Sequence, residues 1–478
     1  MAHHESDRLT AVDAGFLHQE GPTSHMHIGG LIVFEGPPPP FHEVLDTVRG
    51  RLHLLPRYRQ RLEPAPLQSG NPVWIDDPAF NLEYHVRRTA LPAPGRRTQL
   101  REATAQIFSQ RLDRSKPLWE LWVIENLEDD HWALISKTHH ALIDGLSGID
   151  IGTALLDLGP EPMEIPHPDE AWRARPVPTP TELLADGALG LVRTGLVGAA
   201  RAVDALGRPK AALTRAREIA EGIGEMGWAF LNPAPATPLN VTIGSHRRYR
   251  AVESDLATFK RIKDAFGGTV NDVVLAVVTS ALRNWLERRG VRPQGLELRA
   301  LVPVSIRTAD EHGQLGNRLT AMRGPLPVFL EDPIERMEFI REAMKDLKDS
   351  KQALGAETIA NVQSFAPPTI LAQASRLTFS TRLFNLLVTN VPGPQFPLYF
   401  RGREMVRAFP IAFLPKDHAL AVAIMSYNGA INFGLIADHD AVPDLKIIAD
   451  GIADAIDELD QLARQRSADR TPAPSPSA

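Results

Sequence analysis

The chain has 478 residues, of which 43% are hydrophobic and 23% are charged, and its net charge at pH 7 is −6. At about 100–200 residues per domain, this length predicts roughly two to four domains, and the ordinary globular composition excludes a wholly disordered chain or a fibre. The mild acidity argues against general nucleic-acid binding. Because the sequence has no cysteine, it excludes disulfides, thiolate metal sites and a cysteine nucleophile.

We expect neither a signal peptide nor a transmembrane helix. The segment Met1–Thr10 is charged and lacks the apolar core of a signal peptide. The longest uncharged run near the C-terminus, His418–Ala437, contains Asn428, Gly429 and Asn432, which are typical of a hairpin and not of a membrane span. Contact with lipid is therefore expected to be peripheral.

Residues 1–158 are predicted to form an N-terminal α/β domain. Alternating and continuous apolar runs predict three strands, at Ile28–Phe34, Leu121–Leu127 and Trp132–Lys137. Helical spacing of apolar residues predicts helices at Phe41–Leu55, at Gln99–Leu112 and around residues 146–156.

Residues 159–240 are predicted to connect two domains. Their first part is rich in proline, which is excluded from helix interiors and central strands, and residues 181–230 have a helical composition. Within them, the apolar stretch Leu183–Leu206 carries scattered arginines, so it is either an interfacial membrane helix or a helix packed on the protein.

Residues 241–465 are predicted to form a second α/β domain, and residues 466–478 a disordered tail. Asn428-Gly429 between two apolar runs predicts a hairpin, because both residues tolerate positive φ. The predicted helices are Leu256–Phe266, Asn271–Arg288, Pro333–Leu347, Thr358–Leu371 and a last helix from Leu445 to Leu459, and the predicted strands are Leu298–Val304, Leu383–Thr389, Ala419–Met425 and Ile431–Ile436.

The segment HHALIDG, at residues 139–145, carries the clearest chemical signal. Because side chains alternate along a strand, His139 and His140 are expected to face opposite sides, one inward and one toward a cleft. Asp144 lies where a helix is expected to begin and can cap its free N–H groups, and Gly145 permits a tight backbone path. A neutral imidazole held in this way suits general-base work near neutral pH.

Three other interpretations of this segment are open at this point. The two histidines could be satisfied core residues beside a capping Asp144. His139, His140 and Asp144 could bind a metal ion, although the HxH and HExxH patterns are absent. Ser147, His140 and Asp144 could form a hydrolase triad, although Ser147 is not in a GxSxG turn.

The segment HHALIDG resembles the HHxxxDG motif of CoA-dependent acyltransferases. More specifically, the chain is similar over about residues 8–465 to the bacterial bifunctional wax ester synthase/acyl-CoA:diacylglycerol acyltransferases. The segments that carry this resemblance are Leu9–Phe16, Met26–Gly30, Pro117–Trp119, Pro238–Asn240, Asn271-Asp272, Pro303–Ser305 and Asn390–Pro394.

The resemblance implies two domains like chloramphenicol acetyltransferase, with the active site in a tunnel at their interface. It implies that His140 is the general base, while His139, Asp144 and Gly145 organise its loop. The acyl group would pass directly from acyl-CoA to an alcohol, with no covalent enzyme intermediate. Acyl-CoA would be a substrate, and no cofactor and no metal are expected.

Further residues are candidates for the transition state and the substrate channel. Asn271 is an oxyanion or positioning candidate, or simply a helix cap completed by Asp272. Asn390 and Gly393, in the stiff NVPGP bend, could contact substrate or only form a turn. Trp119 either lines the acyl channel or belongs to the core.

Arg247, Arg248 and Arg250 form the densest basic cluster. They are weak candidates for binding the CoA phosphates, and a solvated charged surface is the alternative.

The resemblance predicts an O-acyltransferase that forms triacylglycerol from acyl-CoA and diacylglycerol. Wax ester synthesis from a long-chain alcohol, a non-catalytic lipid-binding relative and a condensation-type enzyme are the alternatives. We expect a cytoplasmic protein peripherally associated with the inner membrane or with lipid droplets, with no nucleic-acid partner. The sequence leaves the oligomeric state and the acyl chain length open.

Overall fold

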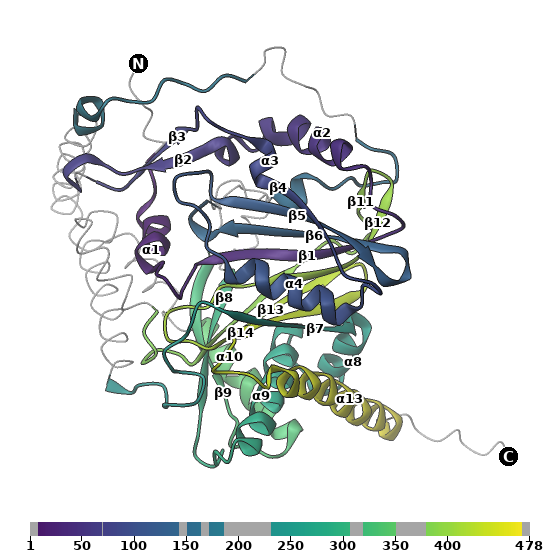
Figure 1. The fold of residues 1–478 in the computed structure, drawn as a ribbon. Coiled ribbons are helices and arrows are strands. Elements are labelled where there is room, and N and C mark those ends of the chain that lie inside the picture. The colour runs from purple at the N-terminus through teal and green to yellow at the C-terminus, as the bar shows by residue number, and fades with distance from the viewer. Residues whose placement is uncertain are drawn as a thin grey trace, which may run out of the picture.

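The computed structural model describes residues 8–68, 70–142, 151–163, 172–185, 231–305, 319–349 and 379–470. Over these residues the chain forms two six-stranded sheets and one two-stranded ribbon. Figure 1 shows the first sheet in the upper half of the view and the second sheet below it. The mixed α/β architecture confirms the predicted fold class.

The first sheet has the strand order β11-β12-β1-β6-β5-β4. Its strands are β1 His27–Glu35, β4 Val86–Ala90, β5 Trp119–Leu127, β6 His131–His139, β11 Tyr399–Phe400 and β12 Arg403–Ile411. A short ribbon of β2 Gln60–Glu63 and β3 Val73–Asp76 lies beside it. The central strands β1 and β6 pair antiparallel from His27 opposite His139 to Glu35 opposite His131.

The second sheet has the order β7-β14-β13-β10-β8-β9. Its strands are β7 Arg247–Asp255, β8 Leu298–Ser305, β9 Leu319–Leu326, β10 Leu386–Pro392, β13 Leu420–Tyr427 and β14 Ala430–Asp438. The predicted hairpin joins β13 to β14: Asn428 and Gly429 have φ values of 43° and 85°, and Tyr427 pairs with Ala430 on either side of the turn.

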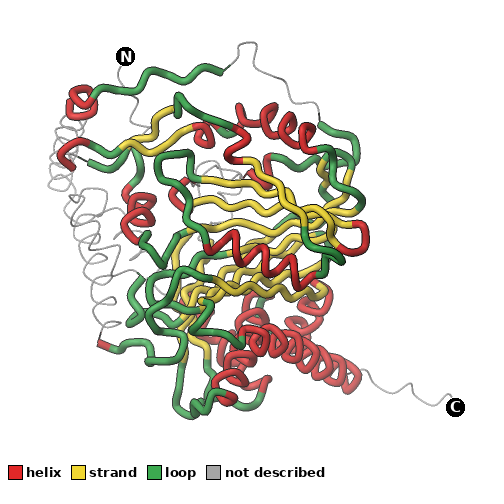
Figure 2. Tube along the Cα trace, viewed as in Figure 1, coloured by secondary structure: helices red, strands yellow, loops and turns green. Residues whose placement is uncertain are grey.

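Helices cover the outer faces of both sheets, as the red segments of Figure 2 show. The α-helices are α1 Ala11–Gln19, α2 Phe41–Arg51, α3 Leu82–His85, α4 Arg97–Ser109, α5 Ile151–Ala154, α8 Leu256–Phe266, α9 Val270–Arg288, α10 Pro333–Asp349 and α13 Leu445–Arg470. The short 3₁₀ helices are η2 Leu52–Leu54, η3 Pro56–Arg59, η4 Pro66–Gln68, η5 Glu128–Asp130 and η6 His140–Leu142.

The alternation of β1 distributes its side chains between two cores. Leu31 and Val33 pack in the cluster that includes residues of α4, whereas Ile32 and Phe34 pack in the cluster that includes residues of α2. The first sheet is therefore buried on both faces, with α4 between it and strand β7 of the second sheet. Such double burial explains why β1 is a continuous apolar run.

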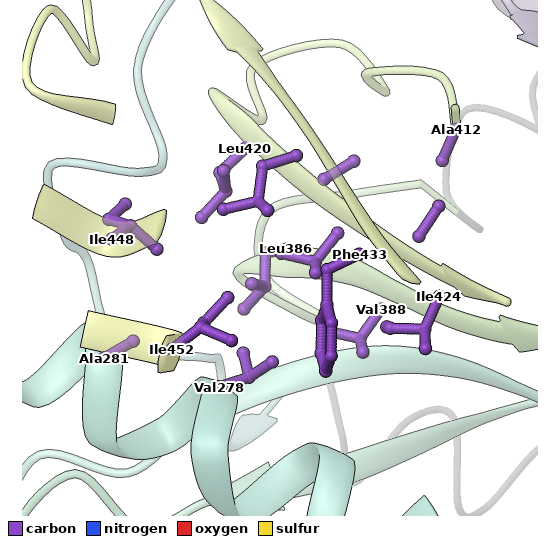
Figure 3. Close-up of a cluster of buried hydrophobic side chains, with 14 of the residues drawn as sticks. Val278, Ala281, Leu386, Val388, Ala412, Leu420, Ile424, Phe433, Ile448 and Ile452 are labelled. Carbon is purple, nitrogen blue, oxygen red and sulfur yellow. The ribbon is translucent and has the colours of Figure 1, made fainter. Parts of the chain in front are cut away.

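The second sheet is covered by α8, α9 and α13, which lie below it in Figure 1. Figure 3 shows Val278 of α9 and Ile452 of α13 beside Leu386 of β10 and Phe433 of β14. All four side chains are fully buried. Burial of one such large side chain contributes about 1.5–3 kcal/mol, so this layer provides much of the stability of the second half.

Two strands from the second half of the sequence complete the first sheet. Strand β12 pairs antiparallel with β1, with Gly29 opposite Ile411, although residues 399–411 lie inside the predicted second domain. The hydroxyl of Tyr427 in β13 accepts from the Leu398 N–H at 2.8 Å and donates to the Met405 carbonyl at 2.9 Å. The two halves are thus joined through shared strands.

Gly434 of β14 lies against strand β12 of the first sheet. A Cβ at this position would lie 1.9 Å from the Pro410 carbonyl oxygen of β12, which is backbone and cannot rotate away. We expect Gly434→Ala to lower the free energy of unfolding by about 2 kcal/mol. Gly159→Ala, where a Cβ meets nothing within 4 Å, is the matched control. Equal urea midpoints for the two variants would contradict a tight contact between Gly434 and the Pro410 backbone.

Several predicted elements differ from the structure or lie outside it. The tail prediction was wrong at its start, because α13 continues to Arg470 and the Ser467 hydroxyl bonds to the Ala463 carbonyl at 2.9 Å within it. Residues 471–478, the predicted helix Thr358–Leu371 and most of Leu183–Leu206 lie outside the described residues.

No single helix in the described part of the chain is long and apolar enough to cross a membrane. Helices α8 and α9 meet the length and composition test only as a pair, and they are bent by 96° relative to each other.

Candidate active site

The site is built at the end of strand β6, where the backbone is held from both sides. The His139 N–H donates to the Leu118 carbonyl at 3.0 Å, and the His140 N–H donates to the Met26 carbonyl at 2.9 Å. Met26 is fully buried and adopts a φ of 52°, a left-handed conformation that costs a non-glycine residue roughly 1–2 kcal/mol. The fold therefore holds a strained backbone where it presents His140.

The rings of His139 and His140 have different neighbours. The His139 ring approaches the His27 ring edge-on at 6.0 Å and is fully buried. The His140 ring instead contacts Phe16 and Phe413, and its side chain stays partly exposed. Of the two residues, His140 is the one with an exposed fraction.

Two phenyl rings from distant parts of the chain contact His140, and a third packs against both of them. Phe16 of α1 stacks on it, with ring centroids 3.9 Å apart and planes 18° apart. Phe413, which follows β12, meets its edge at 5.6 Å. Phe379 lies 6.0 Å from Phe16 and 5.8 Å from Phe413. Helix α1 lies beside the strand ends in Figure 1, so the site combines segments from both halves of the sequence.

This apolar surrounding keeps the His140 ring neutral. Burial lowers the pKa of His140 from its ordinary value of 6.5 to about 4, because a charged imidazolium loses hydration among phenyl rings. Its buried Nδ1 has no hydrogen-bond partner among the described residues. A neutral imidazole can accept a proton, which is the state that a general base requires at pH 7.

His139 holds the turn that follows the site. Its Nδ1 accepts from the Ala141 N–H at 3.0 Å, and burial together with Arg114 lowers its pKa to about 3. Its Nε2 lies 3.8 Å from Oε2 of Glu20. This neutral, fully buried ring suits the loop-organising role that the sequence assigns to it.

Of the HHALIDG segment, residues 139–142 lie among the described residues. Asp144, Gly145 and Ser147 lie outside the described residues. Within the described ranges, no group of three or more histidine, aspartate or glutamate side chains has the arrangement of a metal site.

The two asparagine candidates meet each other in the second half. The Asn390 amide donates to Oδ1 of Asn271 at 3.5 Å. Asn271 is not the cap of α9: that residue is Thr269, which forms a capping box with Asp272. No hydrogen bond or ring contact between described residues joins either asparagine to His140. Their part in oxyanion binding remains a prediction.

Gly393 lies in the bend after β10. Its N–H donates to the Ser426 hydroxyl at 3.3 Å, and a Cβ there would lie 2.3 Å from the Ser426 carbonyl oxygen. Close backbone approach accounts for glycine at this position.

Trp119 is part of the core of the first half. It is fully buried, its indole N–H donates to the Tyr58 carbonyl at 2.8 Å, and the His85 ring stacks on it at 4.7 Å. With the ring packed and its polar atom satisfied, the structure favours the core interpretation of this residue over a place in the acyl channel.

The arginine cluster divides along β7. Arg247 is buried, donates to the Gly244 carbonyl at 2.8 Å and lies 3.8 Å from the Asp438 carboxylate. Arg248 donates to the His439 carbonyl at 2.7 Å. These contacts give both arginines a structural role, because they join β7 to the segments that contain Gly244, Asp438 and His439.

Arg250 lines a groove of about 900 Å³ between α4, β7 and α13. His131, at the start of β6, also lines it, so the groove lies roughly 30 Å along the strand from His140. Leu31 and Val33 line it on the α4 face, and His140 is not among its lining residues. This groove therefore does not open onto the His140 ring.

Sequence reasoning missed Phe16, Phe379, Phe413 and Glu20. In the sequence, each of them looks like an ordinary core or surface residue. Of the four, only Phe16 lies in a segment that carries the family resemblance, Leu9–Phe16.

Comparisons with family models and known proteins identify the family of the chain. The wax ester synthase/diacylglycerol acyltransferase catalytic domain matches residues 9–274, and the WS/DGAT C-terminal domain matches residues 315–460. A Mycobacterium tuberculosis protein named "Probable diacyglycerol O-acyltransferase tgs1" is 36% identical, over 97% of this chain and 98% of that protein.

Solved structures give the same result. The wax ester synthase/diacylglycerol acyltransferase from Marinobacter aquaeolei VT8 matches with a TM-score of 0.69 and 28% identity, over 96% of this chain and 99% of that chain. The first condensation domain of the calcium-dependent antibiotic synthetase, at a TM-score of 0.55 and 16% identity over 95% and 96% of the two chains, shares the fold alone. The chain belongs to the wax ester synthase/diacylglycerol acyltransferase family, a family of acyltransferases with a two-domain fold.

Proposed function

We propose that this chain transfers a fatty acyl group from acyl-CoA to diacylglycerol and so forms triacylglycerol. One observation carries the proposal: a neutral, partly exposed imidazole stands at the end of β6 inside an apolar aromatic surround. The name of the mycobacterial relative supports diacylglycerol as the acceptor. Acyl-CoA is proposed as a substrate and not as a resident cofactor.

In the proposed reaction, His140 removes the proton from the acceptor hydroxyl. The hydroxyl oxygen attacks the thioester carbonyl carbon and forms a tetrahedral intermediate. The carbon–sulfur bond then breaks, and His140 returns the proton to the CoA thiolate, so the imidazole ends neutral. Binding both substrates beside one ring makes the attack effectively intramolecular. A sequence without cysteine agrees with direct transfer.

We also propose that the protein works in the cytoplasm at the surface of the inner membrane or of lipid droplets. Diacylglycerol is held in lipid, so the enzyme must reach a lipid surface to meet it. A tunnel between the two halves, with His140 reachable from both sides, remains part of this proposal.

The test uses the purified full chain with palmitoyl-CoA and either dioleoylglycerol in mixed micelles or hexadecanol. Free thiol and lipid product are measured together. Faster thiol release with triacylglycerol formation supports the proposal. Product from hexadecanol alone favours wax ester synthesis, which the name of the Marinobacter structure includes. Thiol release at background rate with both acceptors would contradict acyl transfer and favour a non-catalytic lipid-binding role, while activity with an acyl carrier protein alone would favour a condensation-type enzyme.

A further inference from the structure

Glu20 connects helix α1 to both histidines of the site. Its backbone N–H donates to the Phe16 carbonyl at 3.0 Å and ends the helix. Phe16 is the residue whose ring stacks on His140. The Glu20 side chain is buried, with only 1% of it exposed.

Two arginines compensate the buried carboxylate. Oε1 of Glu20 lies 3.1 Å from Nη2 of Arg111, and Oε2 lies 3.3 Å from Nε of Arg114. Both guanidinium groups belong to the segment between α4 and β5, and their side chains are 42% and 47% exposed. A carboxylate buried to this degree is tolerated because it is paired.

The third neighbour of this carboxylate is His139. Its Nε2 lies 3.8 Å from Oε2 of Glu20, and both atoms are buried without a hydrogen-bond partner among the described residues. Because Nδ1 of His139 accepts from the Ala141 N–H, the neutral ring must carry its proton on Nε2. The ring N–H therefore faces a carboxylate oxygen.

We infer that Glu20 is a positioning residue for His140: its carboxylate stabilises the Nε2–H tautomer of His139, whose Nδ1 then holds the backbone directly after His140. In the other tautomer, an N–H group on Nδ1 would face the N–H of Ala141, and the turn would lose its bond. Phe16, near the end of the same helix, stacks on the His140 ring. The inference rests on the proposed acyltransferase function.

The first test compares Glu20→Gln with the wild-type chain. We expect kcat to fall about 10–100-fold, because misplacement of a reacting group by about 1 Å has an effect of this size, while KM for palmitoyl-CoA stays unchanged. Glu120→Gln is the matched control. Glu120 is also a buried carboxylate with two cations, Arg87 at 3.2 Å and Lys137 at 3.5 Å. No contact between described residues joins it to His139 or His140, so its neutralisation should leave kcat unchanged.

The second test asks whether Glu20 acts through His139. In His139→Asn, the amide oxygen can accept from the Ala141 N–H in place of Nδ1, and no tautomer needs to be selected. Glu20→Gln should therefore lower kcat much less in this background than in the wild type. An equal loss in both backgrounds, or a folded Glu20→Gln single variant with wild-type kcat, would overturn the inference.

A milder variant covers the case in which Glu20→Gln does not fold. Arg114→Gln removes a half-exposed partner of the carboxylate and leaves the buried groups in place. A lower kcat at unchanged KM supports the inference, and an unchanged kcat overturns it. Wild-type protein without transferase activity would contradict the proposed function itself, so the two failures are distinguishable.

Discussion

His140→Ala should abolish most acyl transfer while the protein stays folded. A positioned general base typically contributes about 10²–10⁴-fold to the rate, so we expect kcat with palmitoyl-CoA and dioleoylglycerol to fall by that factor. The substitution removes the ring that Phe16 and Phe413 enclose and leaves the backbone bond from residue 140 to Met26 in place. Residual activity would reflect binding of the two substrates side by side.

His131→Ala is the matched control for this variant. His131 begins the strand that ends beside His140, and it is also partly exposed. It should retain wild-type kcat. Similar rates for His140→Ala and the wild type, with both proteins folded by circular dichroism, would exclude His140 as the base.

Acid should destabilise the folded chain well above the pH at which carboxylates titrate. Burial is the first cause that lowers the pKa of His25, His85 and His140 to about 4 and that of His139 to about 3. In the unfolded chain, these groups titrate near 6.5. Between about pH 4 and pH 6.5, the unfolded state therefore binds more protons than the folded state, so stability falls as pH falls through this window.

The effect should be large because several rings act together. Each of the four histidines should lower the free energy of unfolding by about 2 kcal/mol between pH 7 and pH 5. The total free energy of unfolding of a domain is only about 5–15 kcal/mol. Urea unfolding at pH 7, 6 and 5 measures the change. A midpoint that stays constant over this range would mean that the rings are solvated and not buried.

Local patterns in the sequence located most helices and strands of the described chain. Helix α8 has the predicted bounds, Leu256–Phe266, because its apolar stripe and the Asp255 cap are both local features. The hairpin at Asn428-Gly429 depends on two adjacent residues that tolerate positive φ. Signals of this kind lie within a few residues and need no knowledge of the rest of the fold.

Local patterns could not predict which strands pair when they are far apart in the sequence. Nothing near β12 in the sequence indicates that Ile411 lies opposite Gly29 in the first sheet. The density of arginines at β7 likewise did not reveal that Arg247 is buried beside Asp438, which is far away in the sequence. A basic cluster predicts charge but not the direction of each side chain, and this is why Arg247 looked available for phosphate.

The site itself was predicted in part. The family resemblance and strand alternation led to His140 as the outward ring and His139 as the inward one. The phenyl rings that enclose His140 could not be predicted, because Phe16 and Phe413 are almost 400 residues apart and meet only in the fold. The same holds for Glu20, whose partners Arg111, Arg114 and His139 lie on two segments far from it in the sequence.

The most direct test of a neutral imidazole base is the pH dependence of kcat/KM between pH 5.5 and pH 8. With a His140 pKa of about 4, the ring is neutral over this whole range, and kcat/KM should stay nearly constant. A base with an ordinary pKa near 6.5 would instead lose about tenfold in rate toward pH 5.5. A sigmoidal fall with its midpoint near pH 6.5, in protein that remains folded, would contradict the account.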